Sequence, residues 1–112
     1  HTRIEIFSAT TNTSSNTTYL EVNNTGSEVV GNFHHMEVYL LQGGTPYMYK
    51  NQSGPLNWTY IIEPPDQVNP GLLDPDEVAN ITVPYDGTKG NATRVTVITA
   101  NGVSASRYTV VI

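Results

Sequence analysis

The residues best suited to chemistry are two adjacent histidines, His34 and His35, the terminal His1, and a short acidic run at residues 74–77. Adjacent side chains of a strand point to opposite faces, so His34 and His35 cannot hold one metal ion together from a strand. We expect one imidazole to be half-buried and the other exposed. The acidic run lacks the glycine and glutamate spacing of a calcium loop and fits better as a turn. We therefore predict no metal, cofactor or catalytic site.

Motifs of common enzyme classes are also missing from the sequence. It contains no glycine-rich phosphate loop, no G-x-S-x-G and no H-E-x-x-H, so nothing specifies a phosphate site, a serine nucleophile or a catalytic zinc. We predict that the protein is not an enzyme.

Aromatic side chains offer a second kind of chemistry, because exposed rings can stack on sugars. Alternating aromatics in strands more often form cross-strand pairs or the core. A carbohydrate-binding or adhesive module is therefore the alternative function, and burial separates the two interpretations. The aromatic residues concerned are Tyr39, Tyr47, Tyr49, Trp58 and Tyr60.

Asparagine residues in glycosylation sequons are more frequent than composition predicts. The sequence has seven N-x-[ST] sequons, where chance alone gives about two. Several lie in predicted turns, where a bulky glycan can be carried, and this favours an exported glycoprotein. The acceptor residues are Asn12, Asn16, Asn23, Asn51, Asn57, Asn80 and Asn91.

Composition limits the remaining possibilities. The 112 residues suffice for one domain spanning residues 1–112. Charged residues make up 13%, the formal net charge is −5, and the five Lys and Arg are scattered, which argues against nucleic acid as a partner. The chain has no cysteine, so it leans toward a prokaryotic exported protein.

Strand signals dominate the chain, and no segment shows a sustained helical period. We predict strands at residues 3–8, 19–22, 33–41 and 78–83, and a hairpin formed by residues 46–50 and 57–62. Residues 20–44 are expected to form one sheet-forming unit, and Trp58, Tyr60 and Ile62 to share a core-facing side. The Ser/Thr-rich residues 8–18 are expected to form a polar loop, and the proline-rich residues 63–77 a crossover or functional loop.

The last segment has the strongest local signal. Asn101-Gly102 predicts a two-residue type I′ turn, which places Val97 opposite Ser106 and Val95 opposite Tyr108. Val95, Val97, Tyr108, Val110 and Ile112 then share one apolar face. About seven to eight short strands without helices predict an all-β, immunoglobulin-like antiparallel β-sandwich.

Three segments carry a resemblance to a known family: VNNTGSEVV, LLDPDEVANITVPY and RVTVITANGVSASRYTVVI. In this order they resemble the ectodomains of archaeal type IV pilin-like envelope proteins, and most of all the archaellum accessory proteins of the FlaF/FlaG type. The resemblance covers roughly residues 20–112. It implies that a processed signal and membrane helix preceded His1, and that the domain lies between the cell membrane and the S-layer. The implied role is to anchor the archaellum or act as its stator, by binding the S-layer protein and a like or paralogous subunit.

A non-enzymatic structural module of this kind acts through a protein-binding surface. We expect it to use sheet edges, exposed apolar loops and the side of residues 33–41 opposite the core. An isologous dimer through an edge strand is an economical arrangement. The predicted interface residues are Tyr39, Leu41, Tyr47, Tyr49, Val68, Leu72 and Leu73.

Overall fold

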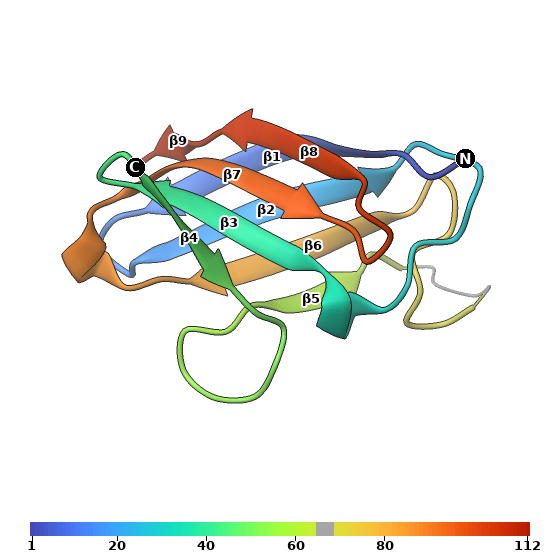
Figure 1. Cartoon of the computed structure of the whole chain (residues 1–112), viewed down its shortest axis with the longest axis horizontal. Helices are drawn as coiled ribbons and strands as arrows, with labels where there is room; N and C mark the ends of the chain where they lie inside the picture. Colours follow the sequence, from blue (N-terminus) through green and yellow to red (C-terminus); the bar gives the residue numbers. More distant parts are fainter. Residues whose placement is uncertain (65–68) are drawn as a thin grey trace.

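The computed structural model describes residues 1–64 and 69–112, which form two β-sheets packed face to face (Figure 1). Within these residues the five-stranded sheet has the order β5-β6-β2-β1-β9 and the four-stranded sheet the order β4-β3-β7-β8. The predicted all-β, immunoglobulin-like sandwich is confirmed. The strands are β1 (Ile4–Asn12), β2 (Thr17–Asn24), β3 (Glu37–Gln42), β4 (Thr45–Tyr49), β5 (Thr59–Ile62), β6 (Val78–Pro84), β7 (Ala92–Ile98), β8 (Ser104–Tyr108) and β9 (Val110–Val111).

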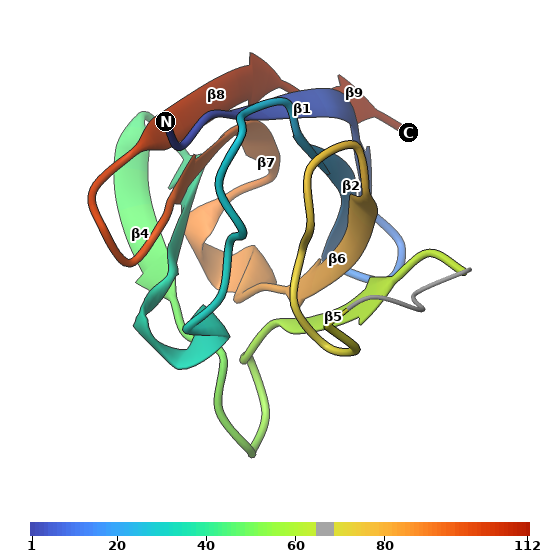
Figure 2. The ribbon, with the colours of Figure 1, turned by 90° about the vertical axis from the view of Figure 1, so that its right-hand side faces the viewer.

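Alternation of apolar and polar residues builds the core between the two layers, which are separated in the view of Figure 2. In a strand every second side chain faces the same way, so most strands contribute alternate residues to the core, whereas both residues of β9 are exposed. Trp58 is fully buried and Ile62 nearly so, while Tyr60 is half-buried, which agrees with the predicted core side. Other core residues are Leu20, Val22, Val38, Leu40, Ala79, Ile81, Val83, Val95 and Val97.

The connection from β2 to β3 crosses between the sheets, so residues 20–44 do not form one sheet unit as predicted. Within this connection, Val30 forms an isolated antiparallel bridge with Leu73. A short 3-10 helix, η1 (Phe33–His35), then turns the chain into β3. Buried Phe33 stacks on Tyr60 with ring centroids 3.9 Å apart, and this apolar contact fixes the crossing.

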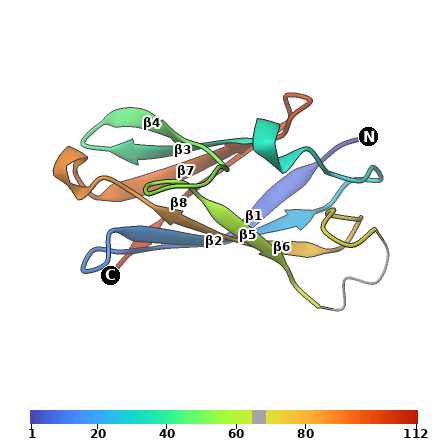
Figure 3. The same ribbon diagram turned by 90° about the horizontal axis from the view of Figure 1, so that it is seen from below.

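The predicted hairpin of residues 46–50 and 57–62 is also wrong. β4 pairs with β3, and β5 pairs with β6 in the other sheet. Figure 3 shows β4 and β5 in different layers. The reason lies in Trp58: its indole Nε1 donates to the carbonyl of Tyr49 at 3.0 Å, and burial of the whole ring pulls the chain across the core.

Residues 8–18, predicted to be a polar loop, form most of the β1–β2 hairpin instead. Thr11 and Thr18 are fully buried, and their hydroxyl oxygens lie 2.8 Å apart in a hydrogen bond. Two inward-facing threonines can satisfy each other, so a Ser/Thr-rich segment packs at the sheet interior despite its polarity. In the turn, the Asn12 Oδ1 accepts from the backbone N–H of Ser14 at 3.0 Å.

The β7–β8 hairpin exists, but its register differs from the prediction by one residue. Val97 opposes Ala105 and Val95 opposes Arg107. The loop has three residues rather than two, because Thr99 pairs with Val103 and its hydroxyl accepts from the Val103 N–H at 3.0 Å. Gly102 takes a φ of 89° at the end of this loop, the left-handed position of a three-residue hairpin.

After β8 the chain changes sheet, which overturns the predicted apolar face at residues 95–112. β9 pairs with β1 in parallel, Thr10 opposite Val110 and Thr11 opposite Val111. Val95 and Val97 are buried, whereas the apolar side chains of the last segment point into solvent. The exposed residues are Tyr108, Val110, Val111 and Ile112.

A buried polar network ties the two sheets together at the end of the sandwich nearest the C-terminus (Figure 1). Gln42 of β3 donates from Nε2 to the carbonyls of Asp86 and Gly90 at 2.9 and 3.0 Å. Its Oε1 accepts from the Tyr49 hydroxyl at 2.6 Å, and burial raises the pKa of Tyr49. The crossover from β6 to β7, which contains η2 (Gly87–Lys89), is thereby held against β3.

Candidate protein-binding surface

The outer side of the four-stranded sheet carries neighbouring apolar side chains that lack a protein layer above them within the described residues. Leu41 lies opposite Pro46, and Tyr39 opposite Met48. Across the sheet, Leu41 also lies opposite Arg94, which pairs with Tyr108 on β8. We call this surface the four-strand face. It comprises Tyr39, Leu41, Pro46, Met48, Arg94, Thr96, Ile98, Ser106 and Tyr108.

Polar groups on the four-strand face are partnered with one another. The Tyr39 hydroxyl donates to the Glu37 carboxylate at 3.1 Å, and this hydrogen bond raises the pKa of Tyr39. The Arg94 guanidinium lies over the Tyr108 ring, 5.3 Å from its centroid. The Thr96 and Ser106 hydroxyls are 2.7 Å apart. A partner docking here therefore meets apolar surface and pre-satisfied polar groups, which lowers the desolvation cost of binding.

The structure separates the predicted interface residues into two groups. Tyr39 and Leu41 are half-buried on the four-strand face, and Leu72 is exposed at a loop. Tyr49 and Leu73 are buried, and Tyr47 is half-buried against the core. Tyr47 and Tyr49 lie opposite Leu40 and Val38, so they share the inward side of the sheet. Val68 lies outside the described residues.

Met48 and Tyr108 belong to the four-strand face but were not singled out from the sequence. Met48 follows directly from the alternation in residues 46–50, since Tyr47 and Tyr49 are its inward neighbours. Tyr108 was placed in the core by the assumed two-residue turn. With the correct register of the β7–β8 hairpin, Tyr108 lies opposite Arg94 on the outer side of the sheet.

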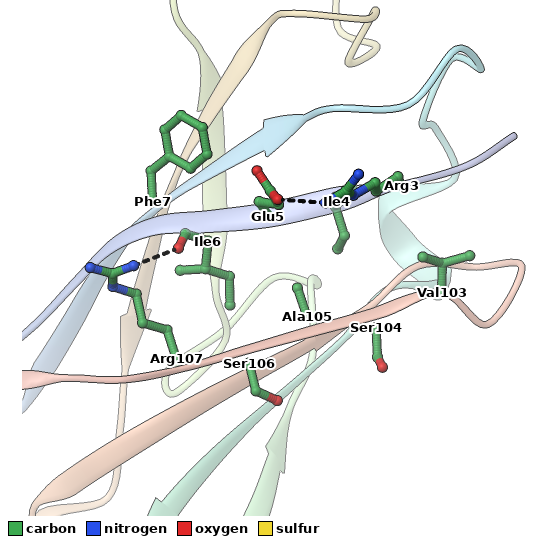
Figure 4. Close-up of a pocket in the computed structure, with 10 residues that line it drawn as sticks. All are labelled: Arg3, Ile4, Glu5, Ile6, Phe7, Val103, Ser104, Ala105, Ser106 and Arg107. Carbon is green, nitrogen blue, oxygen red and sulfur yellow. Dashed lines mark hydrogen bonds and ion pairs between the residues drawn. The ribbon is translucent and has the colours of Figure 1, made fainter.

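A groove runs between β1 of the five-stranded sheet and β8 of the four-stranded sheet (Figure 4). It encloses about 570 Å³ and is lined by residues 3–7 and 103–107. The Arg107 guanidinium reaches across it to the Ile6 carbonyl at 3.3 Å, and Arg3 pairs with Glu5 at 3.0 Å (Figure 4). Both guanidinium groups thus already donate to groups of the chain, Arg3 to a carboxylate and Arg107 to a neutral backbone carbonyl. Within the described residues the charge of Arg107 has no acidic partner.

The aromatic residues considered for sugar binding do not form an exposed platform. Trp58 and Tyr49 are buried, while Tyr60 stacks on Phe33 beside the core. The Tyr47 ring carries the Lys89 ammonium 4.9 Å from its centroid. Rings used in this way belong to the core and its rim. Of the five residues considered, Tyr39 alone lies on the outer side of the four-stranded sheet.

The histidines and acidic residues are dispersed. His34 and His35 lie in η1 rather than in a strand, and both are exposed, so the prediction of one half-buried imidazole is wrong. The His34 Nδ1 is 3.0 Å from the carbonyl of Asn51. Within residues 1–64 and 69–112, no three His, Asp or Glu side chains are grouped to hold a metal ion. The acidic run at residues 74–77 forms a turn, in which the Glu77 carboxylate accepts from the Asp74 N–H at 2.8 Å.

Comparison with known proteins identifies relatives of the fold. No family model and no curated protein sequence matches the chain. Among solved structures, the archaellum periplasmic stator protein FlaG from Sulfolobus acidocaldarius matches with a TM-score of 0.67 and 24% identity. That match covers 96% of this chain and 98% of the other. The chain has the fold of the archaellum stator proteins.

A second solved structure supports the same likeness. A chain of the archaellum periplasmic stator protein complex FlaF and FlaG, from the same organism, matches with a TM-score of 0.69 and 23% identity. The match covers 96% of this chain and 88% of that chain. The fold expected from the resemblance to the FlaF/FlaG type is therefore confirmed over nearly the whole sequence. In the described part of the chain, no helix is long and apolar enough to cross a membrane.

Proposed function

We propose that this domain is a non-enzymatic structural module of an archaellum stator. The observation that carries the proposal is the likeness to archaellum stator structures, which extends over 96% of the chain. The dispersed histidines and acidic residues, together with a well-packed core, support a binding role rather than a catalytic one. The domain acts outside the cell membrane, in the space beneath the S-layer, because one matching protein is described as periplasmic.

Pairing with a paralogous subunit is the binding event we assign to this chain. One of the similar structures is a complex of FlaF and FlaG, so the fold is used for such pairing elsewhere. The four-strand face suits it: Leu41, Pro46 and Met48 lie side by side and exclude water readily when covered. Arg94, opposite Leu41, supplies a charge that can select an acidic partner residue.

Binding to the S-layer protein is the second part of the proposal. In the absence of a paralogous subunit, we expect the domain to form a homodimer. The loop that leads into β6 lies at the opposite end of the sandwich from β9 (Figure 1). Exposed Leu72 belongs to this loop and therefore to a separate surface. Two separate surfaces permit one domain to bind a subunit and the S-layer at the same time.

The experiment combines two binding assays with the purified domain. Sedimentation velocity with the paralogous ectodomain is expected to show a complex, formed in preference to a homodimer. Co-sedimentation with isolated S-layer sheets, at acidic and neutral pH, is expected to pellet the domain, while insoluble polysaccharide does not. If the domain stays monomeric with the paralogue and remains in the supernatant with the sheets, the stator proposal fails. Pelleting with polysaccharide alone would instead support a carbohydrate-binding module.

A further inference from the structure

The seven glycosylation sequons differ sharply in how the fold presents them. An N-linked glycan is attached when the Asn Nδ2 attacks the anomeric carbon of a sugar carried on a polyisoprenoid phosphate. The Nδ2–carbon bond forms as the carbon–oxygen bond to the lipid phosphate breaks, the lipid phosphate leaves with the electron pair, and the amide loses a proton. The sequon hydroxyl, two residues on, must also be reachable by the transferase. The structure contains the acceptor amide and the hydroxyl of all seven sequons.

Two sequons have their acceptor amide bonded to the backbone. The Asn51 Nδ2 donates to the Trp58 carbonyl at 2.9 Å. The Asn57 Nδ2 donates to the carbonyls of Ser53 and Pro55 at 3.0 and 3.2 Å. A sugar on Asn57 must displace one of its two bonds, since a glycosylated amide nitrogen keeps a single N–H. At Asn51 the amide is held against the backbone of the β4–β5 crossing, so both sequons are poor acceptors in the folded domain.

Two further sequons have an inaccessible hydroxyl. The sequon of Asn16 ends at Thr18, whose side chain is fully buried and bonded to Thr11. The sequon of Asn23 ends at Thr25, whose hydroxyl oxygen is buried. At Asn80, the amide donates to the Glu63 carboxylate at 3.1 Å, and the sequon lies flat along β6 in the middle of a sheet.

Asn12 and Asn91 combine an available amide with an accessible hydroxyl. In the described residues neither Nδ2 donates a hydrogen bond, and the hydroxyl-bearing residues Ser14 and Thr93 are exposed. The Asn12 Oδ1 caps the β1–β2 turn, so its amide nitrogen is directed away from the backbone. Asn91 is exposed directly before β7.

The same two residues flank the exposed apolar segment at the C-terminal end of the fold. The Thr109 N–H donates to the Thr93 carbonyl at 3.0 Å, two residues from Asn91. The Thr13 N–H, next to Asn12, donates to the Ile112 carbonyl at 3.0 Å. In the segment held by these two hydrogen bonds, Val110 and Ile112 are each 64% exposed. In Figure 1 the β1–β2 turn, the start of β7 and β9 lie at one end of the sandwich.

We propose that Asn12 and Asn91 carry N-linked glycans, and that these two glycans cover the apolar segment of residues 110–112. An exposed apolar strip at a sheet edge invites association with other chains. Bulky hydrated glycans on both sides prevent that contact and leave the four-strand face as the open apolar surface. The proposal does not depend on the archaellum assignment.

The test is made on the chain secreted from an archaeal host with N-glycosylation, with a glycosylated host protein as positive control. Peptide mapping by mass spectrometry is expected to find glycans at Asn12 and Asn91, and unmodified peptides at Asn51 and Asn57. Ser14→Ala and Thr93→Ala are each expected to remove one glycan, because both substitutions delete a sequon and keep the acceptor. Ser53→Ala, the matched control, deletes the sequon of Asn51. The mass of the intact protein is expected to fall by one oxygen atom, with no loss of a glycan.

The covering role has its own readout. The double variant Ser14→Ala/Thr93→Ala is expected to bind an apolar fluorescent dye several-fold more strongly than the glycosylated protein, at an unchanged melting temperature. Unglycosylated protein from a bacterial host should behave like the double variant. Unmodified Asn12 and Asn91 alongside a glycosylated control protein overturn the proposed sites. Unchanged dye binding after loss of both glycans overturns the covering role.

Discussion

The two outer sides of the sandwich differ in how their exposed apolar residues are arranged. On the five-stranded sheet, Tyr19 lies between Thr10 and Thr82, and Ile61 lies opposite Asn80. These two apolar side chains are each set among polar neighbours on the adjoining strands. On the four-strand face, Leu41 adjoins Pro46 and Tyr39 adjoins Met48. The comparison shows that contiguity, rather than the number of exposed apolar residues, marks a surface suited to binding.

Hydrogen bonding follows the same division. On the five-stranded sheet, the Ser8 hydroxyl donates to the Glu21 carboxylate at 2.8 Å and the Asn80 amide donates to Glu63. Ionised and amide groups there bind water strongly, so covering them costs free energy. Among the residues of the four-strand face the one cation, Arg94, already lies over an aromatic ring. We infer that, of the two outer sides, the four-strand face gains more from being covered.

The largest expected effect separates Leu40 from its neighbour Leu41. Leu40 is fully buried, so Leu40→Ala leaves a cavity between the sheets and should lower the free energy of unfolding by about 2–5 kcal/mol. Leu41→Ala, one residue on and facing outward, should cost less than about 1 kcal/mol. Urea unfolding of both variants measures the difference. Equal losses would show that Leu41 belongs to the core and not to a binding surface.

An intermediate effect is expected at the inward side of the five-stranded sheet. Thr11→Val removes one partner of the buried Thr11–Thr18 hydrogen bond and leaves the Thr18 hydroxyl unsatisfied. The free energy of unfolding should fall by about 1–3 kcal/mol. The double variant Thr11→Val/Thr18→Val removes both hydroxyls and should recover most of this loss. A double variant as unstable as the sum of two single ones would mean that the two residues act independently.

The smallest effect concerns the crossover that joins the two sheets, and it depends on pH. Hydrogen bonds from Thr88 hold the pKa of Asp86 below its ordinary value. A carboxyl with a depressed folded-state pKa stabilises the protein above its unfolded-state pKa of about 3.9, and this contribution disappears as pH falls through the folded-state pKa. Asp86→Asn should therefore lower the melting temperature slightly at pH 7 and have no such effect near pH 2. A difference that persists unchanged in acid would contradict the assignment.

The sequence predicted the parts of the fold that depend on alternation. Val38 and Leu40, Ile81 and Val83, and Trp58 are buried as expected, because side-chain period and burial are local properties of a strand. Strand partners were predicted less well. Residues 46–50 and 57–62 resemble a hairpin, but burial of Trp58 sends them to different sheets. Only the tertiary arrangement decides between a hairpin and a crossover of this length.

The candidate surface shows the same limit. Tyr39 and Leu41 followed from alternation, whereas Tyr108 depended on a register that the Thr99 hydroxyl changes by one residue. A one-residue slip exchanges the two sides of a strand, so one side-chain hydrogen bond in a turn changes the side on which Tyr108 and the other residues of β8 lie. The sequons were visible in the sequence, but their availability depends on partners such as Thr11 and the Trp58 carbonyl.

The most direct test of the four-strand face is a calorimetric titration of the paralogous stator ectodomain into two matched variants. Leu41→Asp places a carboxylate in the apolar strip, and it stays compatible with folding because Arg94 lies opposite. Thr82→Asp places the same charge on the outer side of the five-stranded sheet. We predict at least a tenfold loss of affinity (about 1.4 kcal/mol) for Leu41→Asp and affinity within about twofold of wild type for Thr82→Asp. Wild-type affinity for Leu41→Asp, or loss only for Thr82→Asp, would contradict the central claim.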